Sequence, residues 1–571
     1  MKRIFLTLLV ALSIPLTLAD TWPTGHFVLE TEALTVDVTI LDVSDSDIHT
    51  QVSWSGSNEL GLMAGSVTGH FTLTQPNEAH FQLSPTSGDV FMLKQTTFGE
   101  LVFRFQSDAR PELNTSGFLK PDQQAPLSFS TVSVDEARDA LPPLSRWVDY
   151  LNDDIWPYWR SDEAARFVGT RCNDGSLPDL DTLCPELRPE WIRAGLDQNY
   201  IRMVSRQTYA YGVIFHLTGN TDALALMNEG VQRILQRIND DGSVVTHLQD
   251  GAPLYLDGQQ TSQDIAYAQV GLAMAYYLTG DEDLLRSIDR IKQHLFSNYR
   301  NEHWNMLAWT LTDQQPGDAQ QQELVAQLDQ LNAYLLLMYP LLPEPMQRDW
   351  QVDIEWLVTV LLDSFHQPEQ HRFAGQLVNG QANQPGERHN DYGHSVKSYW
   401  MILLAGERLN RPDWIETAET GIRHITEQAF RFHSRPEAFS TWAYQSYSRN
   451  SSWWEYAELT QASATMALRD DEFVRYLPEA YRGWFGQFVD PTWGGVWMGA
   501  GGGAKQHLWK NAYHETELAL VAAITTAKLQ KTPYSLFFAE EQTQFQPYFF
   551  DGEVQTVVPA GLGRQRVIFS P

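Results

Sequence analysis

A succession of apolar-striped stretches of helical length between about residues 188 and 530 limits what this chain can fold into. Long loops rich in glycine and aromatic residues, such as 241–245 and 490–497, separate alternate stretches. Apolar residues at helical spacing indicate amphipathic helices. Helix pairs joined in this way predict a closed toroid of helical hairpins, whose inner helices surround a central site. The stretches are 200–217, 223–238, 264–278, 323–339, 350–365, 393–407, 414–430, 453–467 and 514–529.

The chain before the helices has a different pattern. From about residue 21 to residue 129, apolar residues alternate with polar ones in short runs bounded by turn residues, which is typical of an antiparallel β-sandwich. We therefore predict an α+β multi-domain protein. Its parts are a β-sandwich domain (20–135), a connector (136–187), the helical toroid (188–530) and a strand-like tail (531–571) that joins either the sandwich or the toroid.

Residues 1–19 have the pattern of a secretory signal peptide. Lys2 and Arg3 precede an apolar run that ends with Thr17-Leu18-Ala19. We expect a secreted or periplasmic protein, with no membrane span in the rest of the chain. The two cysteines, Cys172 and Cys184, are near neighbours and are expected to form a disulfide in an oxidising compartment.

The charge of the chain argues against some partners. The formal net charge is −31, and loss of Lys2 and Arg3 with a leader would lower it to −33. A strongly acidic surface without a run of basic residues repels phosphate backbones. Nucleic acid is therefore not expected as a partner, and a polyanionic polysaccharide is disfavoured as a substrate.

The stretch from Lys510 to Leu520 carries the most distinctive candidate for chemistry. His514 follows Tyr513 where a glycine-rich loop is predicted to enter a helix. A neutral histidine in such a place can accept or donate a proton near neutral pH. The alternative is a structural histidine that packs against Tyr513.

Seven short stretches of the helical region resemble motifs of one family. They are Arg206 to Tyr209, Asp250 to Leu254, Gln263 to Ala268, Tyr276 to Asp281, Asp391 to His394 with Trp400, Trp453 to Glu458, and Lys510 to Glu517. In this order they resemble the N-acylglucosamine 2-epimerase family, which includes cellobiose 2-epimerases and mannose isomerases. The resemblance implies an (α/α)6 barrel, a mono- or oligosaccharide substrate, and proton transfer at sugar C2 by two histidines.

The resemblance also assigns candidate site residues. The catalytic candidates are His514, which matches one of the two family histidines, His394 and Glu458. The candidates for substrate binding are Arg206, Trp453, Trp454, Tyr513, Tyr267 and Asp264. Trp453 and Trp454 would point to different sides of a helix, so we expect one of them to pack in the core. Arg206 has an alternative role as an interior ion-pair partner of Glu458 or Glu517.

Three positions depart from the family pattern. Leu336 stands where the other histidine is expected, Lys397 where the family has glutamate, and Glu517 where it has arginine. Leucine cannot move a proton, so His394 or a tyrosine such as Tyr334 would have to act as the partner of His514. Lys397 and Glu517 have opposite charges and are predicted to pair with each other.

Three functions remain open at this stage. The first is a sugar isomerase or epimerase that uses His514. The second is a glycoside hydrolase or lyase on the same barrel, which would use carboxylates such as Glu458 and Glu517. The third is a carbohydrate-binding protein without catalysis. The sequence has no phosphate-binding glycine motif and no metal-ligand pattern, so no cofactor or metal is expected. Residues 499–503 are predicted to form a mobile flap.

Overall fold

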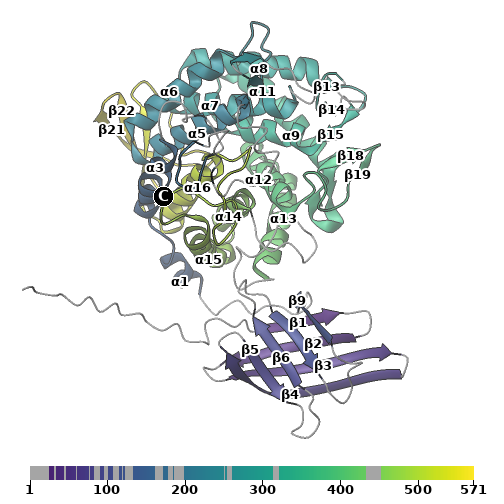
Figure 1. The fold of residues 1–571 in the computed structure, drawn as a ribbon. Coiled ribbons are helices and arrows are strands. Elements are labelled where there is room, and N and C mark those ends of the chain that lie inside the picture. Colours follow the sequence, from purple (N-terminus) through teal and green to yellow (C-terminus); the bar gives the residue numbers. More distant parts are fainter. Residues whose placement is uncertain are drawn as a thin grey trace, which may run out of the picture. The chain divides into compact units, whose positions relative to one another are not determined.

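The computed structural model of the chain describes residues 25–30, 34–43, 47–58, 61–75, 78–82, 90–95, 101–106, 115–118, 120–121, 133–160, 167, 171–177, 184, 198–249, 251–253, 260–312, 320–431 and 452–571. The predicted leader (1–19) lies outside these residues. The chain divides into two compact units, residues 1–130 and 131–571, which are described separately (Figure 1).

The N-terminal unit is built from antiparallel strands, as the alternating pattern predicted. The strands lie in the order β8-β7-β6-β5-β4-β3-β2-β1-β9 within one hydrogen-bonded sheet, so chain neighbours from β1 to β8 are also spatial neighbours. Val38, Ile40, Phe71 and Leu93 are buried. The two-layer arrangement of a sandwich remains a prediction. The strands are β1 (Gly25–Glu30), β2 (Leu34–Val43), β3 (Asp47–Asn58), β4 (Gly61–Gln75), β5 (Glu78–Gln82), β6 (Val90–Gln95), β7 (Leu101–Gln106), β8 (Thr115–Phe118) and β9 (Lys120–Pro121).

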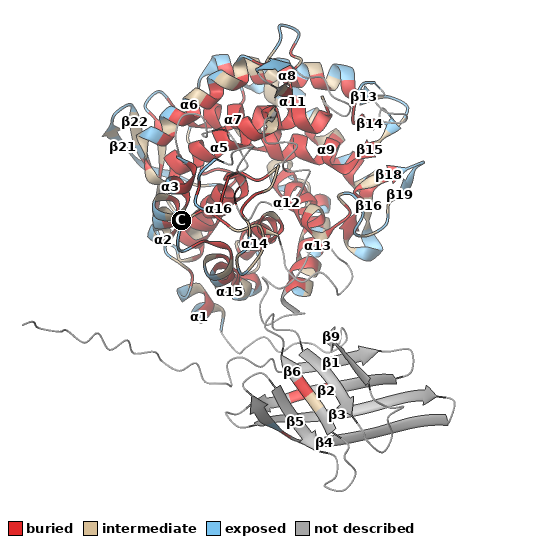
Figure 2. Cartoon of the chain, viewed as in Figure 1, coloured by how far each residue is buried: buried red, intermediate tan, exposed pale blue. Residues whose placement is uncertain are grey.

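The second unit is organised around a closed ring of inner helices. Helix α5 packs against both α7 and α16, α7 against α9, α10 against α12, α12 against α14, and α14 against α16. Almost every residue of these helices is buried, which Figure 2 shows in red. The ring helices are α5 (Ile201–Thr218), α7 (Ser262–Thr279), α9 (Leu324–Gln330), α10 (Leu336–Met338), α12 (Tyr392–Leu409), α14 (Trp453–Ala467) and α16 (Tyr513–Leu529); the π-helical turn η5 (Leu331–Leu335) joins α9 to α10.

Outer helices cover the ring and expose a polar face to solvent (Figure 2). They are α6 (Thr221–Leu235), α8 (Glu282–Tyr299), α11 (Glu344–Val360), α13 (Pro412–Arg431) and α15 (Leu477–Gly483). Helix α2 and turn η3 pack against α16 in the same way. The helices before the ring are α1 (Val134–Asp139), α2 (Leu144–Asp149), η3 (Tyr150–Ile155) and α3 (Trp156–Trp159), and the shorter turns within it are η6 (Tyr339–Leu341), η7 (Leu361–Phe365), η8 (Pro368–Gln370), η10 (Asp471–Tyr476) and η11 (Trp484–Phe488).

In two hairpins of the ring, the chain turns at similar short sequences, Thr218-Gly219-Asn220 and Thr279-Gly280-Asp281. Gly219 ends α5 with a φ of 71°, and Gly280 ends α7 with a φ of 70°. Glycine adopts this left-handed conformation without a steric penalty. The next residue, Asn220 or Asp281, caps the following outer helix with its side chain. The chain therefore reverses within two residues from an inner to an outer helix.

Short strands lie in the loops between the hairpins. They form the sheets β10-β11-β12, β13-β14, β15-β18-β19 and β16-β17. Their bounds are β10 (Gln198–Tyr200), β11 (His247–Gln249), β12 (Ala252–Pro253), β13 (Arg300–Asn301), β14 (Met306–Leu307), β15 (Gln322–Glu323), β16 (His366–Gln367), β17 (Arg372–Phe373), β18 (Gln376–Val378) and β19 (Gln381–Ala382).

The C-terminal tail belongs to the helical unit. Its strands β20 (Tyr534–Ala539), β21 (Val554–Gly561) and β22 (Arg564–Phe569) form a separate sheet, and β20 packs against α5 and α7. The described tail strands are not part of the N-terminal sheet, so they do not complete it. The predicted disulfide between Cys172 and Cys184 is present. No helix in the described part of the chain combines the length and the apolar character that a membrane span requires.

Candidate functional site

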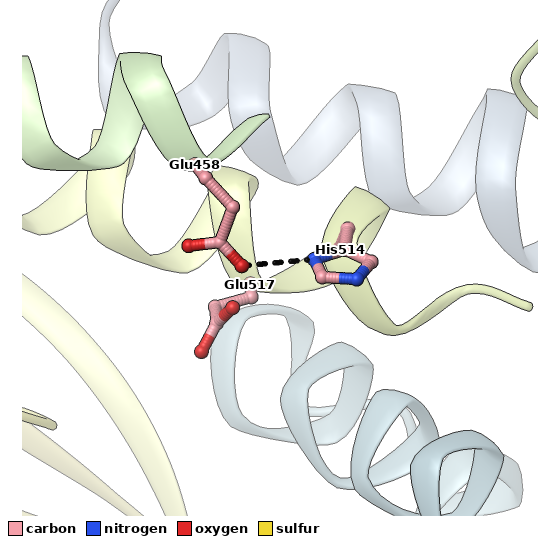
Figure 3. Close-up of side chains that lie close together, drawn as sticks. All are labelled: Glu458, His514 and Glu517. Atoms are coloured by element: carbon pink, nitrogen blue, oxygen red, sulfur yellow. Dashed lines mark ion pairs between the residues drawn. The ribbon is translucent and has the colours of Figure 1, made fainter. Parts of the chain in front are cut away.

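His514 lies at the start of α16 and faces two charged side chains. As predicted, the loop after the glycine run leads directly into this helix, and Asn511 accepts a hydrogen bond from the backbone N–H of Tyr513 at its first turn. His514 Nε2 lies 2.6 Å from Arg206 Nη2. His514 Nδ1 lies 3.3 Å from Glu458 Oε1, as Figure 3 shows. The imidazole is therefore held between a cation and a carboxyl group.

The contact with Arg206 determines the tautomer of His514. A guanidinium group only donates hydrogen bonds, so Nε2 must accept, and the ring proton of the neutral imidazole lies on Nδ1, facing Glu458. Burial lowers the pKa of His514 well below its ordinary value, and the positive charges of Arg206 and Lys397 lower it further. His514 is thus a neutral base near pH 7.

Two carboxyl groups share the space beside His514. Oxygens of Glu458 on α14 and Glu517 on α16 and a nitrogen of His514 all lie within 4.8 Å of one another. Burial raises the pKa of Glu458 to about 8, and the neighbouring charge of Glu517 raises it as well, against the opposing effect of Lys397. Burial also raises the pKa of Glu517.

Lys397 does not pair with Glu517, which corrects the sequence prediction. Its ammonium group lies 2.9 Å from Asp329 Oδ1 and 3.2 Å from the hydroxyl of Tyr267. Tyr267 also donates to Asp329, and Gln263 Nε2 donates to the other oxygen of that carboxylate at 2.7 Å. Asp329 was not among the residues predicted for the site. In the sequence it could be recognised only as an acidic residue within the otherwise largely apolar stretch 323–339.

His394 on α12 has a carboxylate partner of its own. Its Nδ1 lies 2.8 Å from Asp391 Oδ2, while Asp391 Oδ1 caps the helix by accepting from the backbone N–H of His394. The ring of His394 contacts the ring of Trp454 at a centroid distance of 4.9 Å, and the ring of His514 lies 6.2 Å from the same indole. Both histidine rings therefore lie near the same indole.

Gly393 allows this arrangement of Trp454. A Cβ atom at Gly393 would lie 2.7 Å from Cη2 of the indole, closer than carbon atoms approach. Trp453, the other member of the tryptophan pair, is buried and lies near His507 and Lys510. Of the two indoles, Trp454 is thus the one that lies near His394 and His514.

The remaining candidates have partners within the protein. The ring of Tyr513 lies beneath the guanidinium group of Arg206, and its hydroxyl accepts from Asn332. Asp264 is bound by Arg202 and by the hydroxyl of Thr261, so its carboxylate orients Arg202. Arg206 makes no ion pair with either glutamate; its partners are His514 and the carbonyl oxygen of Trp509.

Two residues of the inner helices, Leu336 and Tyr334, are not available for proton transfer. Leu336, at the position of the expected family histidine, is buried among apolar residues. Tyr334, the alternative partner of His514, packs edge-on against Trp350 of the outer helix α11 and bonds to Gln330. These contacts place the ring of Tyr334 against the outer helix.

Several buried polar atoms around His514 have no hydrogen-bond partner among the residues that the structure describes. They are Arg206 Nε, both carboxyl oxygens of Glu458, Glu517 Oε2, Asn332 Oδ1 and His514 Nδ1. Buried polar atoms are normally paired, since desolvation without a hydrogen bond costs about 1–3 kcal/mol each. Donors and acceptors concentrated in this way suit a ligand that carries several hydroxyl groups.

A metal ion fits this group of residues less well. Glu458, Glu517 and His514 lie close enough to share an ion. However, the nitrogen of His514 that faces the carboxyl groups carries the ring proton while Arg206 occupies the other nitrogen. Two further cations, Arg206 and Lys397, act on the same carboxyl groups. The arrangement therefore favours a proton shared by Glu458 and Glu517 over a bound metal ion.

The glycine run 499–503, predicted as a mobile flap, is tied to three other segments. Gly499 forms a β-bridge with Ser452 at the start of α14, and Gly501 N–H donates to the carbonyl oxygen of Gln487. Asn173, next to the disulfide, donates to the carbonyl oxygen of Gly503 at 2.8 Å. These bonds hold the loop that leads into His514.

Comparisons with known proteins agree with the ring of helices. A family model described as N-acylglucosamine 2-epimerase matches residues 195–514, more than half of the chain. The cellobiose 2-epimerase of Spirochaeta thermophila DSM 6192 has 16% identity and a TM-score of 0.55 over 70% of this chain and 100% of its own. The cellobiose 2-epimerase of Bacillus thermoamylovorans B4167 has 14% identity and a TM-score of 0.53 over 67% and 98%.

A structure titled D-mannose isomerase has 14% identity and a TM-score of 0.53, over 70% of this chain and 100% of its own. At these identities the likeness establishes the fold and leaves the reaction open. No curated protein matches the sequence significantly.

Proposed function

The chain belongs to the N-acylglucosamine 2-epimerase family, and we propose that it is a sugar epimerase or isomerase that moves a proton on the carbon next to a carbonyl group. The ring of helical hairpins would be an (α/α)6 barrel, and the residues at the starts of its inner helices would bind a mono- or oligosaccharide. The unpartnered polar atoms around His514 support a substrate rich in hydroxyl groups.

The observation that carries the proposal is the pair of histidines, His394 and His514, whose rings both lie near the indole of Trp454. Each has a carboxyl partner at its Nδ1: Glu458 for His514 at 3.3 Å and Asp391 for His394 at 2.8 Å. A carboxyl group at Nδ1 leaves Nε2 to act on the substrate. Asp391 would stabilise the imidazolium that forms on His394, and Glu458, whose pKa burial raises to about 8, would orient the ring of His514. His394 would thus take over the role for which Leu336 is unsuited.

The proposed reaction begins with an open-chain sugar. One histidine removes the proton from C2, and the electrons move to the C1 carbonyl oxygen to give an enediolate. Return of a proton to C2 from the opposite face inverts that carbon. Return of a proton to C1, with transfer of the O2 hydroxyl proton to O1, produces the ketose. Inversion needs a base on one face of the sugar and an acid on the other, roles that two separate histidines would fill.

The negative charge that develops on the carbonyl oxygen has several stabilising groups nearby. The guanidinium carbon of Arg206 lies 5.0 Å, and the ammonium nitrogen of Lys397 5.7 Å, from the ring centre of Tyr267. His394, Trp454 and His514 all lie in the first turn of their helices, so the positive ends of three helix dipoles face the same region. Fixed positive groups of this kind lower the energy of an enediolate.

The hydrolase alternative has less support from the carboxyl groups. Retaining glycosidases place two carboxyl groups about 5–5.5 Å apart, and inverting ones about 6.5–9.5 Å. Oxygens of Glu458 and Glu517 lie within 4.8 Å of each other, and the two side chains project from neighbouring helices. Carboxyl groups with such close oxygens can share a proton.

A secreted or periplasmic location is part of the proposal. The leader-like residues 1–19 and the disulfide between Cys172 and Cys184 both support an oxidising compartment. Detection of the chain in periplasmic or culture-medium fractions, but not in the cytoplasm, would test this location.

The experiment that tests the reaction is incubation with a panel of mono- and disaccharides in D₂O, followed by NMR of the C1 and C2 protons. Deuterium at C2 together with a new epimer or ketose is the expected result. His514→Ala and His394→Ala should each abolish inversion. The base that remains should still exchange the C2 hydrogen of the sugar whose hydrogen faces it.

Other outcomes would select the alternatives. New reducing ends without exchange would identify a hydrolase. Saturable binding of a sugar without exchange or cleavage would identify a carbohydrate-binding protein. Full activity in both histidine variants would contradict the proposed roles of His514 and His394.

A further inference from the structure

Tyr548, in the C-terminal tail, reaches the group of residues around His514. It lies between β20 and β21, beyond the part of the chain that the family model covers. Its backbone N–H donates to the hydroxyl of Tyr277 on α7, and its own hydroxyl donates to Glu517 Oε1 at 2.8 Å. The tail therefore supplies a direct partner to a carboxyl group of the candidate site.

Three phenol groups surround the same oxygen. Besides Tyr548, the hydroxyls of Tyr209 and Tyr513 each lie 3.5 Å from Glu517 Oε1, and Tyr209 also bonds to Tyr548 at 2.7 Å. All three tyrosines are buried. The other oxygen, Glu517 Oε2, is buried without a hydrogen-bond partner. One side of the carboxyl group is thus anchored by phenol groups, and the amide of Gln461 also lies beside it.

We propose that Tyr548 is a positioning residue of this site: its hydroxyl holds Glu517 as the carboxylate, so that the proton shared by the two neighbouring glutamates resides on Glu458. The inference rests on the proposed function, in which Glu458 supports His514. It adds that the tail, and not only the ring of helices, determines the charge state of the site.

The direction of the effect follows from the groups that face the two glutamates. Around Glu517 these are Tyr548 from the tail, Tyr209 and Arg206 from α5, Lys397 from α12, Tyr513 from its own helix, and Glu458 from α14. Asp329 on α9 and His514 on α16 also face Glu458. Of all these, the hydrogen bond from Tyr548 is the largest single contribution that lowers the pKa of Glu517, against the opposing effect of burial.

Removal of that hydrogen bond should move the proton. In Tyr548→Phe, Glu517 is less stable as a carboxylate and gains the proton, because hydrogen bonds to a charged group favour the charged form. A neutral Glu517 no longer repels the charge of Glu458. The midpoint at which Glu458 ionises should therefore fall by about one pH unit.

The test is an infrared titration of the full chain between pH 5 and 10, which follows the carboxylic acid C=O band. Glu458→Gln identifies the band of Glu458 by its loss. Tyr548→Phe should shift the midpoint of that band to lower pH, and Tyr534→Phe is the matched control. Tyr534 is a buried tyrosine at the start of the same tail, whose hydroxyl lacks a hydrogen-bond partner.

If the midpoint is unchanged in Tyr548→Phe, Tyr209 could have taken over the hydrogen bond to Glu517. In that case the double variant Tyr209→Phe/Tyr548→Phe shows the shift to lower pH and supports the proposal. An unchanged midpoint in the double variant as well, or an equal shift in Tyr534→Phe, overturns it. The infrared signal does not depend on turnover, so this result is independent of whether any sugar is converted.

Discussion

Arg206 Nη2 lies 2.6 Å from His514 Nε2. This is the nitrogen that a base would use, and the contact with Arg206 engages it. A substrate oxygen must accept the hydrogen bonds of Arg206 before Nε2 can accept a proton. Substrate binding and exposure of the base are therefore coupled through one guanidinium group.

Substitution of Arg206 by glutamine should raise the pKa of His514. A nearby cation disfavours the imidazolium form, so its removal favours protonation, although burial, the largest effect, keeps the pKa below the ordinary value. We expect a loss of roughly ten- to hundredfold in kcat/KM, as for a lost hydrogen bond to a charged group. NMR titration of the histidine ring protons would measure the change in pKa.

The matched control is Arg202→Gln, which removes a neighbouring cation that bonds to Asp264 and not to His514. The titration of His514 should be nearly the same as in the wild type. A His514 pKa that stays unchanged in Arg206→Gln would show that the contact is not maintained in solution.

Substitution of Asp391 by asparagine separates two roles of this side chain. Asparagine can still cap α12, so the melting temperature should change little. It cannot stabilise a positive charge on His394, whose Nδ1 lies 2.8 Å from the carboxylate. We expect a fall in kcat on the order of a hundredfold with little change in KM, since general acid–base catalysis contributes about 10²–10⁴.

Thermal unfolding and steady-state kinetics of the same preparation would check this separation. Asp391→Ala serves as the comparison, because it loses the cap as well and should be less stable by about 1 kcal/mol. Equal activities of Asp391→Asn and the wild type would remove His394 from the mechanism.

The helices and the side chains nearest His514 could be predicted from the sequence. The residues that bind those side chains in turn could not. The position of His514 at a helix start and its approach by a glycine-rich loop follow from local patterns of residues, as does the buried face of each helix. Asp329 and Tyr548 contact the site from segments far apart in the chain, and no spacing rule connects them to Lys397 or Glu517. Opposite charges at ring positions suggested a pair of Lys397 with Glu517, although Asp329 lies closer.

Substitution of Gly393 by alanine should displace Trp454. The added Cβ would lie 2.7 Å from the indole, so the ring must move away from its contacts with His394 and His514. We expect KM to rise several-fold and the tryptophan fluorescence to change. Overpacking of this kind costs about 1–3 kcal/mol of stability.

Gly499→Ala is the control for that variant. Gly499 lies in the glycine run, and a Cβ atom there meets nothing within 4 Å. Its kinetics and fluorescence should match those of the wild type. If Gly393→Ala also behaves like the wild type, Trp454 does not contribute to binding.

Substitution of Lys397 by methionine should destabilise the protein in a pH-dependent way. Lys397 and Asp329 are both almost completely buried, and loss of one partner of a buried pair costs about 3–5 kcal/mol. Burial acts to raise the pKa of Asp329, but Lys397 and the hydrogen bonds outweigh it, so the pKa is lowered. The pair thus contributes stability above the unfolded-state pKa of aspartate, and this contribution is lost as the pH falls through the lowered folded-state value.

In Lys397→Met the hydrogen bonds from Gln263 and Tyr267 remain, but the effects of Lys397 that oppose burial are lost. The pKa of Asp329 should therefore rise, and the carboxyl group should take up a proton more readily as the pH falls. The difference in melting temperature from the wild type should accordingly be larger at pH 8 than at pH 5. The double variant Lys397→Met/Asp329→Asn has no buried charge and should recover much of the lost stability at pH 8. Differential scanning calorimetry of the three proteins at both pH values would measure this. A loss that is independent of pH and persists in the double variant would mean that Lys397 stabilises the ring by packing alone.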